Sequence, residues 1–298
     1  MVSTGLVRKL RYKLKENKKP MLSRTKAGNV GIFIFLLCIG IFMILPVFYS
    51  VIQAFKPIEE YYAFPPRFFV KNPTLENFKM VFELAGNLWV PFSRYLFNSV
   101  LVSVGGTVVY AFVASMAAYP LAKAKFPGKT LISMLVVYAL LFQGDAITLP
   151  RYIILAGLGT INTYWAVILP VMAGTMGVFL MQQFLTASIP DATLEAARID
   201  GASEYTVFFK IVMPCAKPAW LTVIIFTFQG LWNSNPQTYI YSENLKLLPS
   251  VLSTIASGGI TRAGAGSAVS VFMMIPPILI FLYSQSSVMQ TMAHSGLK

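Results

Sequence analysis

The chain has 298 residues, of which 56% are hydrophobic and only 12% are charged, and its mean hydropathy is +0.66. Soluble domains carry about 25% charged residues, so this composition excludes a soluble enzyme and a soluble binding module. The formal net charge of +13 resembles that of a nucleic-acid-binding protein, but most of this chain must lie in lipid, and no nucleic-acid partner is expected.

Six apolar stretches are candidates for membrane-spanning helices, because a span needs about 20 predominantly apolar residues. Segments 156–163 and 254–267 are rich in Gly, Ser, Ala or Thr and are predicted to be loops or surface. The spans near 164–185 and 268–289 are therefore placed after these segments. Leu75–Phe82 is predicted to form a short surface helix. The expected fold is all-α, a polytopic membrane protein with six transmembrane helices, near residues 27–55, 95–122, 130–149, 164–185, 218–242 and 268–289.

The Lys and Arg residues predict the orientation, since positively charged loops stay in the cytoplasm. With the N-terminus inside, the inner segments hold 16 basic residues and a net charge of +11, against 8 basic residues and +2 outside. Both termini are therefore predicted to be cytoplasmic. The expected organisation is a basic N-terminal segment 1–29, a six-helix transmembrane domain 30–290 with an inner loop at about 186–217, and a cytoplasmic tail 291–298.

Residues of the kinds used in catalysis are scarce and isolated. Cys38 and Cys215 lie far apart in the sequence, and His294 has no acid or nucleophile beside it. There is no Ser/His/Asp arrangement, no Gly-rich phosphate loop and no spacing typical of metal ligands. We expect no catalytic residue, no metal and no cofactor bound by this chain.

The inner loop 186–217 is predicted to form two short helices joined at a tight corner. Pro190 suits a helix start, and nothing from Asp191 to Ile199 breaks a helix. Gly201 is a left-handed stop, and Ser203 is a favourable N-cap for a second helix that runs until Pro214.

Each of these two helices has a patterned face. Asp191, Glu195 and Arg198 form one charged stripe on the first helix. The small side chains of Ala196 and Ala197 keep the flanks of this helix narrow. On the second helix an apolar stripe of period i, i+3, i+4, i+7 is predicted to be packed; it consists of Tyr205, Phe208, Phe209 and Val212. This periodicity fits equally an elbow that a cytoplasmic partner pushes and an amphipathic connector that lies on the membrane.

The run Glu195-Ala-Ala-Arg-Ile-Asp-Gly201, followed by Ile211-Val-Met-Pro214, resembles the EAA loop of ATP-binding-cassette (ABC) importer permeases. The chain is similar to the carbohydrate branch, and to the second permease subunit of maltose-type transporters, over nearly its whole length. Its ending, Met289–Lys298, looks like the subgroup for oligosaccharides from polysaccharide breakdown. The landmarks that carry this resemblance are Ala54–Pro57, Pro73–Phe78, Tyr95–Ser99, Ala118–Lys123, Phe126–Gly128 and Leu231–Asn233.

The resemblance implies that the helix around Glu195–Asp200 is a coupling helix that docks on a separate ATPase. It also implies a bacterial cell membrane location, a second homologous permease subunit, two ABC ATPase subunits that bind ATP and Mg, an extracellular solute-binding protein and an oligosaccharide substrate. The residues expected to couple the chain to the ATPase are Asp191, Glu195, Ala196, Ala197, Arg198, Asp200, Gly201 and Pro214.

A substrate path needs polar and aromatic groups inside the spans. The candidates are Gln143, Asp145, Met172, Thr175, Trp232, Asn233 and Asn235. Trp232 and Asn233 fit equally an interfacial anchor and an interhelical hydrogen bond, and Asp145 fits a carboxylate near the interface.

Three other functions remain open from the sequence. An ion-coupled secondary transporter would need an intramembrane relay of ionisable residues, for which only Asp145 qualifies. A non-transporting scaffold would leave Glu195–Gly201 unexplained. A peptide or phosphate permease is the nearest competitor among ABC importers, and the outer-loop and Trp232-Asn233 landmarks favour a sugar.

Overall fold

The computed structural model describes residues 26–86, 90–142 and 147–295, which fall into two units, 1–50 and 51–298. All regular structure in these ranges is helical, which confirms the predicted all-α class. Most of the basic segment 1–29, the last three residues of the tail, and the candidates Gln143 and Asp145 lie outside the described residues.

The first unit contains most of one helix, α2 (Lys26–Ala54), whose 29 residues measure about 43 Å at 1.5 Å per residue. Its apolar side chains are exposed on every face; Phe42 and Met43, for example, are 75% and 72% exposed. A helix that is apolar all round needs lipid or protein on all sides. This helix is therefore suited to cross a bilayer.

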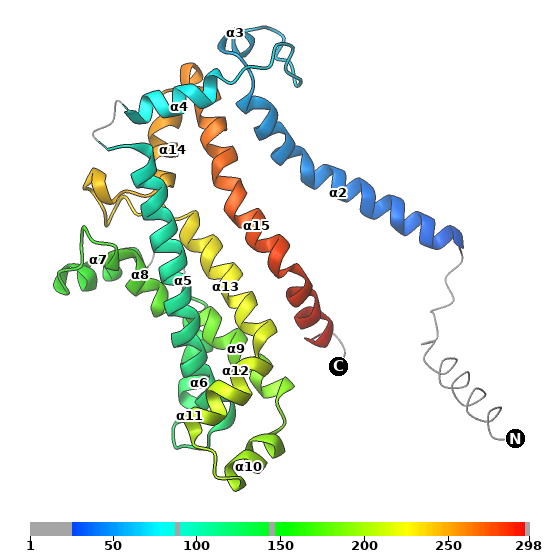
Figure 1. Ribbon diagram of the computed structural model, residues 1–298, viewed down its shortest axis with the longest axis vertical. Helices are drawn as coiled ribbons and strands as arrows, with labels where there is room; N and C mark the ends of the chain where they lie inside the picture. Colours follow the sequence, from blue (N-terminus) through cyan, green and yellow to red (C-terminus); the bar gives the residue numbers. More distant parts are fainter. Residues whose placement is uncertain (1–25, 87–89, 143–146, 296–298) are drawn as a thin grey trace, which may run out of the picture. The chain divides into compact units, whose positions relative to one another are not determined.

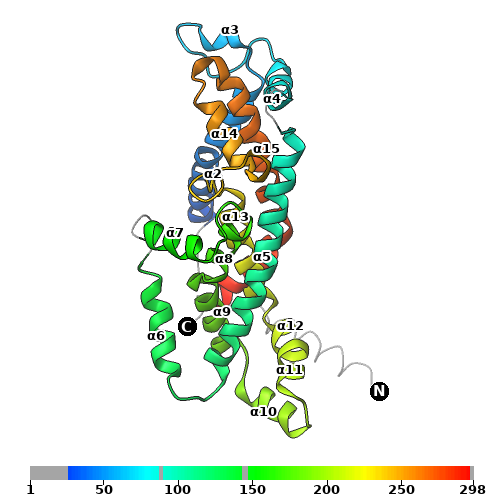
Figure 2. The same cartoon turned by 90° about the vertical axis from the view of Figure 1, so that its left-hand side faces the viewer.

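The second unit contains the remaining helices, which Figures 1 and 2 label. Their bounds are α3 (Ile58–Tyr61), α4 (Glu76–Gly86), α5 (Phe92–Lys123), α6 (Lys129–Ala139), α7 (Thr148–Gly157), α8 (Trp165–Met172), α9 (Thr175–Ser188), α10 (Asp191–Ile199), α11 (Glu204–Thr206), a π-helical turn Val207–Val212, α12 (Met213–Cys215), α13 (Lys217–Trp232), α14 (Leu248–Ala256) and α15 (Ala263–Ser295), with 3-10 turns at Glu243–Leu245 and Ile260–Arg262.

Helix α5 is the centre of the second unit, and it packs against α8, α9 and α13, while α13 also packs against α15. Small residues on α5 allow this close approach. A β-carbon on Gly106 would lie 2.7 Å from Cδ1 of Leu231 on α13, a distance that no packed core tolerates. Within this unit, α10 and α11 lie at one end, and α3, α4 and α14 lie at the other (Figure 2).

Among the residues that the structure describes, four helical segments are long and apolar enough to cross a membrane: Gly28–Ala54, Phe92–Lys123, Trp165–Ser188 and Ile260–Gln285. A fifth span is present if the bent pair Glu204–Cys215 and Lys217–Trp232, which meet at 76°, is one span. The expected span 130–149 is represented by α6, whose 11 residues reach only about 16 Å. Part of that span lies outside the described ranges, so the number six stays a prediction.

The predicted surface helix over Leu75–Phe82 corresponds to α4, Glu76–Gly86. Asn77 on α4 is buried and donates hydrogen bonds from Nδ2 to the carbonyls of Ala54 and Lys56, at 2.9 and 2.7 Å. This amide satisfies carbonyls left without partners at the end of α2.

Candidate functional site

The loop between α9 and α13 forms the two short helices and tight corner that were predicted; we define residues 190–216 as the elbow. The chain enters α10 from Pro190, and α10 ends before Gly201, whose φ is +82°. The Gly201 N–H donates to the Arg198 carbonyl and the Ala202 N–H to the Ala197 carbonyl, both at 3.0 Å. These two bonds form a Schellman motif, in which glycine adopts a left-handed conformation without steric cost.

The second arm of the elbow starts as predicted, but its apolar face differs from the prediction. The Ser203 hydroxyl caps α11 by accepting from the Thr206 N–H at 3.3 Å. The predicted packed stripe is wrong at Tyr205 and Phe209, which are 77% and 51% exposed. The π-helical turn Val207–Val212, which follows Tyr205 and contains Phe209, departs from the 3.6-residue period on which the predicted stripe rested.

Two of the three residues of the predicted charged stripe on α10 form ion pairs within the protein. Lys123 Nζ, at the end of α5, lies 2.8 Å from Asp191 Oδ1. Arg198 Nε lies 2.6 Å from Glu204 Oε1 across the corner, and this hydrogen bond raises the pKa of Arg198 above its ordinary value. Glu195 is exposed and has no ion pair or hydrogen bond with another described residue. Of the three, Glu195 is the one free to meet a partner.

The Lys123–Asp191 pair predicts a pH dependence. The hydrogen bond from Lys123 lowers the pKa of Asp191 below its ordinary 3.8, so the folded state favours the ionised carboxylate. This stabilisation is present at neutral pH and is lost as the pH falls through the lowered pKa. We expect Asp191→Asn to lower the melting temperature of the purified protein at pH 7, and the difference from wild type to shrink below about pH 4. A difference that does not change with pH would contradict the pairing.

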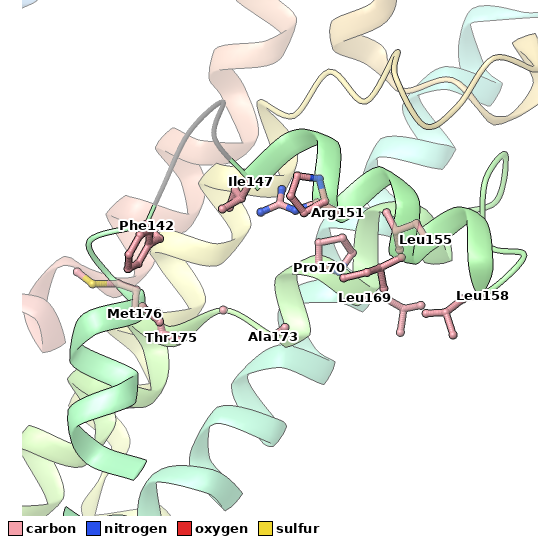
Figure 3. A pocket seen from close by; sticks show the side chains of 14 residues that line it. Phe142, Ile147, Arg151, Leu155, Leu158, Leu169, Pro170, Ala173, Thr175 and Met176 are labelled. Carbon is pink, nitrogen blue, oxygen red and sulfur yellow. The ribbon is translucent and has the colours of Figure 1, made fainter. Parts of the chain in front are cut away.

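A pocket of about 680 Å³ lies among α7, the end of α6 and the break between α8 and α9 (Figure 3). Its lining is mostly apolar, with the Arg151 guanidinium from α7 and the Thr175 hydroxyl from α9 as polar side chains. Phe142, Thr175 and Met176 lie together on one side of the pocket (Figure 3). An apolar cavity with a few polar groups is the usual form of a small-molecule site.

The break that shapes this pocket is held by a tyrosine from α5. Tyr110 is buried, and its hydroxyl donates to the Gly174 carbonyl and accepts from the Gly177 N–H, both at 2.8 Å. A β-carbon on Gly177 would lie only 2.5 Å from that hydroxyl oxygen. Glycine at 177 is therefore required for the tyrosine to reach the backbone.

The predicted substrate-path residues that the structure describes do not gather at one place. Thr175 lines the pocket, and Met172 ends α8 nearby without being part of the lining. Trp232 is 1% exposed, and its indole N–H donates to the Met273 carbonyl at 2.9 Å. This placement fits the alternative of an interhelical hydrogen bond.

The two asparagines near Trp232 are exposed, and each forms a hydrogen bond within the protein. Asn233 Nδ2 donates to the Gln229 carbonyl at 2.9 Å. Asn235 Oδ1 accepts from the Ser250 hydroxyl at 3.0 Å. Neither residue lines the described pocket.

Sequence reasoning did not single out Tyr119, Lys123, Glu204 and Arg151 as site residues. Tyr119 and Lys123 lie within the landmark Ala118–Lys123 and are spaced i, i+4, so they share a helix face. This spacing within a family landmark is the sequence feature from which a shared role of Tyr119 and Lys123 could have been predicted. Among the described residues there is no group of three or more His, Cys, Asp or Glu that could hold a metal ion, and Cys38 and Cys215 are unpaired thiols.

The long apolar helices, the elbow and the pocket define the class: a polytopic helical membrane protein with a structured loop at one end. No family model matches the chain. It is 33% identical over 228 residues to Protein LplC of Bacillus subtilis, covering 74% of this chain and 73% of the relative. It is 31% identical over 227 residues to the arabinooligosaccharides transport system permease protein AraQ of Halalkalibacterium halodurans, covering 76% of this chain and 80% of the relative.

A solved structure of a bacterial ABC transporter involved in the import of the acidic polysaccharide alginate has a chain with the same fold. The TM-score is 0.74 at 19% sequence identity, and the match covers 90% of this chain and 99% of the chain in that structure. The chain belongs to the family of permease proteins of ABC sugar transport systems. This confirms the family predicted from the EAA-like run.

Proposed function

We propose that this protein is a permease subunit that carries oligosaccharides across the bacterial cell membrane, driven by ATP hydrolysis on separate subunits. The observation that carries the proposal is the elbow, a capped helix at one end of the unit with an unpartnered exposed face. In this proposal the chain has no catalytic residue. It pairs with a second homologous permease, two ATPase subunits that bind ATP and Mg, and an extracellular solute-binding protein.

The exposed face of α10 is the surface we assign to the ATPase. Glu195 is free, Ile199 is 85% exposed, and Ala196 is exposed between them. Small side chains beside an acid let a helix seat closely in a cleft and meet a basic group. Leu194 on the opposite face is 1% exposed and anchors α10 to the protein.

The proposed topology has six spans, with the elbow and both termini in the cytoplasm. Its support is the excess of basic residues in the inner segments and the length of α5. The 32 residues of α5 measure about 48 Å, against a hydrocarbon core of about 30 Å. Its last turn therefore extends out of the core on the side of the elbow.

We assign the pocket at the break between α8 and α9 to the substrate path, with Thr175 and Arg151 as its polar contacts. A guanidinium beside apolar walls is costly unless an anion or water meets it. An acidic oligosaccharide, such as the polysaccharide carried by the structural relative, supplies carboxylates that match this charge.

Arg151→Gln tests the acidic substrate class. We expect uptake of a uronate-containing oligosaccharide to fall by about tenfold or more, since a lost charged hydrogen bond removes about 1.5–3 kcal/mol. Uptake of a neutral arabinooligosaccharide should change little. Arg262→Gln, at an exposed arginine outside the pocket, is the matched control. Equal uptake by wild type and Arg151→Gln for the acidic sugar would remove Arg151 from the path.

Site-specific crosslinking tests the docking surface. A photo-crosslinking amino acid at Glu195 or Ile199 should capture the ATPase subunit in membranes that contain the whole transporter. The control is the same amino acid at Tyr283, which is 83% exposed on α15, outside the elbow. Capture from Tyr283 but not from α10 would contradict the assignment.

A further inference from the structure

We propose that α5 is the relay that connects the elbow to the pocket, with Lys123 and Tyr119 holding the elbow and Tyr110 holding the break between α8 and α9. This inference rests on the proposed function of α10 as the coupling helix. It adds three positioning residues. Lys123 and Tyr119 contact the elbow through Asp191 and Glu204, and none of the three bonds to Glu195 or lines the pocket at the α8–α9 break.

Lys123 fastens α5 to the junction of α9 and α10. Its Nζ donates to the Ile189 carbonyl at 2.6 Å and to Asp191 Oδ1 at 2.8 Å, and its side chain is only 5% exposed. A buried ammonium is stable only when it is paired. The Lys123 ammonium binds the carboxyl end of α9, where the helix dipole favours a cation. It also binds Asp191 in the first turn of α10, where the helix dipole favours an acid.

Tyr119 lies one turn before Lys123 and fastens the corner of the elbow. Its hydroxyl donates to Glu204 Oε2 at 2.9 Å. The same carboxylate accepts from Arg198 Nε at 2.6 Å and from its terminal nitrogen at 3.4 Å. Glu204 therefore joins α5, the end of α10 and the start of α11 at one point beside Gly201.

Apolar packing makes these parts one body. Leu194 of α10, Val207 and Val212 of the π-helical turn, and Ala114 and Ala118 of α5 belong to one buried cluster. Packed cores shift as units and do not deform gradually. A push on α10 must therefore move this end of α5.

The other end of the relay is Tyr110, 13 residues before Lys123 and thus about 20 Å away along the helix. The helix is continuous between them, although Pro120 removes one of its backbone hydrogen bonds. The Tyr110 hydroxyl is bonded on both sides of the break, to Gly174 and Gly177. Gly174 and its neighbour Thr175 line the pocket, so a shift of α5 changes the pocket wall.

The experiment uses the complete transporter, purified with its partner subunits and reconstituted in lipid vesicles. The reporter is Thr175→Cys in a background of Cys38→Ser and Cys215→Ser, labelled with a charged, membrane-impermeant maleimide. Labelling is compared with and without ATP and vanadate. We expect trapping to change the labelling rate at least about fivefold when the relay is intact, the lower range for coupled sites.

In Lys123→Met, Tyr119→Phe and Tyr110→Phe we expect ATP hydrolysis to persist while the labelling change falls below about twofold and uptake falls with it. Lys125→Met removes an exposed charge two residues from Lys123 and should behave as the parent. Tyr119→Phe and Tyr110→Phe each delete only one hydroxyl. They therefore test the relay through α5 even if Lys123→Met fails to assemble. A full labelling change in both tyrosine variants would overturn the relay.

Glu195→Lys separates this inference from the proposed function. If α10 docks on the ATPase, Glu195→Lys abolishes the labelling change whatever the relay variants do. If Glu195→Lys and the relay variants all behave as the parent, the coupling assignment itself fails, and the relay fails with it. If only Glu195→Lys loses the change, the coupling assignment holds and the relay through α5 is wrong.

Discussion

Gly201→Pro is expected to abolish ATP-driven uptake while the protein still inserts in the membrane. Gly201 has a φ of +82°, and proline is fixed near −65°. Proline also removes the N–H that Gly201 donates to the Arg198 carbonyl. The corner cannot form, at a local cost of about 3 kcal/mol or more, so we expect uptake to fall well over tenfold. Transport assays on vesicles with matched amounts of the permease measure this.

Gly201→Asn is the matched control for the corner. Asparagine tolerates the left-handed conformation, and no atom other than those of its chain neighbours lies within 4 Å of a β-carbon built at 201. This variant should keep most of its uptake. Glu195→Lys, which leaves the corner intact, should uncouple ATP hydrolysis from uptake. Normal transport by both Gly201→Pro and Glu195→Lys would contradict the coupling role of the elbow.

Trp232→Ala is expected to produce the largest loss of stability. The Trp232 side chain is 1% exposed and stacks on Phe228, with ring centroids 5.7 Å apart. Truncating a buried tryptophan costs about 3–5 kcal/mol. The melting temperature of the detergent-purified protein should fall sharply, and the yield of intact protein should fall with it.

Trp232→Phe separates the interhelical hydrogen bond from most of the aromatic packing. An aromatic ring is kept, but it is smaller, and the Met273 carbonyl on α15 loses its indole donor; the lost hydrogen bond should cost about 1–3 kcal/mol, with a smaller packing loss added to it. A different outcome would return Trp232 to the substrate path: an unchanged melting temperature in Trp232→Ala together with a selective loss of uptake for one sugar.

Local chemistry is the part of the elbow that the sequence could predict. Pro190, Gly201 and Ser203 act through backbone conformation and capping within a few residues, and the structure places each at its predicted position. The ion pairs that engage the charged stripe of α10 were not predictable in the same way. Asp191 is engaged by Lys123, which lies 68 residues earlier, and no periodicity within α10 reports such a contact.

Tertiary packing explains the remaining differences. The π-helical turn interrupts the expected α-helical stripe: Phe208 and Val212 are buried as that stripe requires, and Val207, which lies outside the stripe, is buried with them. The pocket depends on a break between α8 and α9 that Tyr110 stabilises from α5. Hydropathy predicts a single span near residues 164–185, and the hydropathy pattern carries no information on the break between α8 and α9.

The energy source of uptake tests the central claim most directly. The transporter, reconstituted with its ATPase, its partner permease and its binding protein, is assayed for entry of a labelled oligosaccharide into vesicles. Uptake should require ATP and the binding protein, stop with vanadate, and survive collapse of the proton gradient. Uptake that continues without ATP and stops when the proton gradient is collapsed would contradict the account.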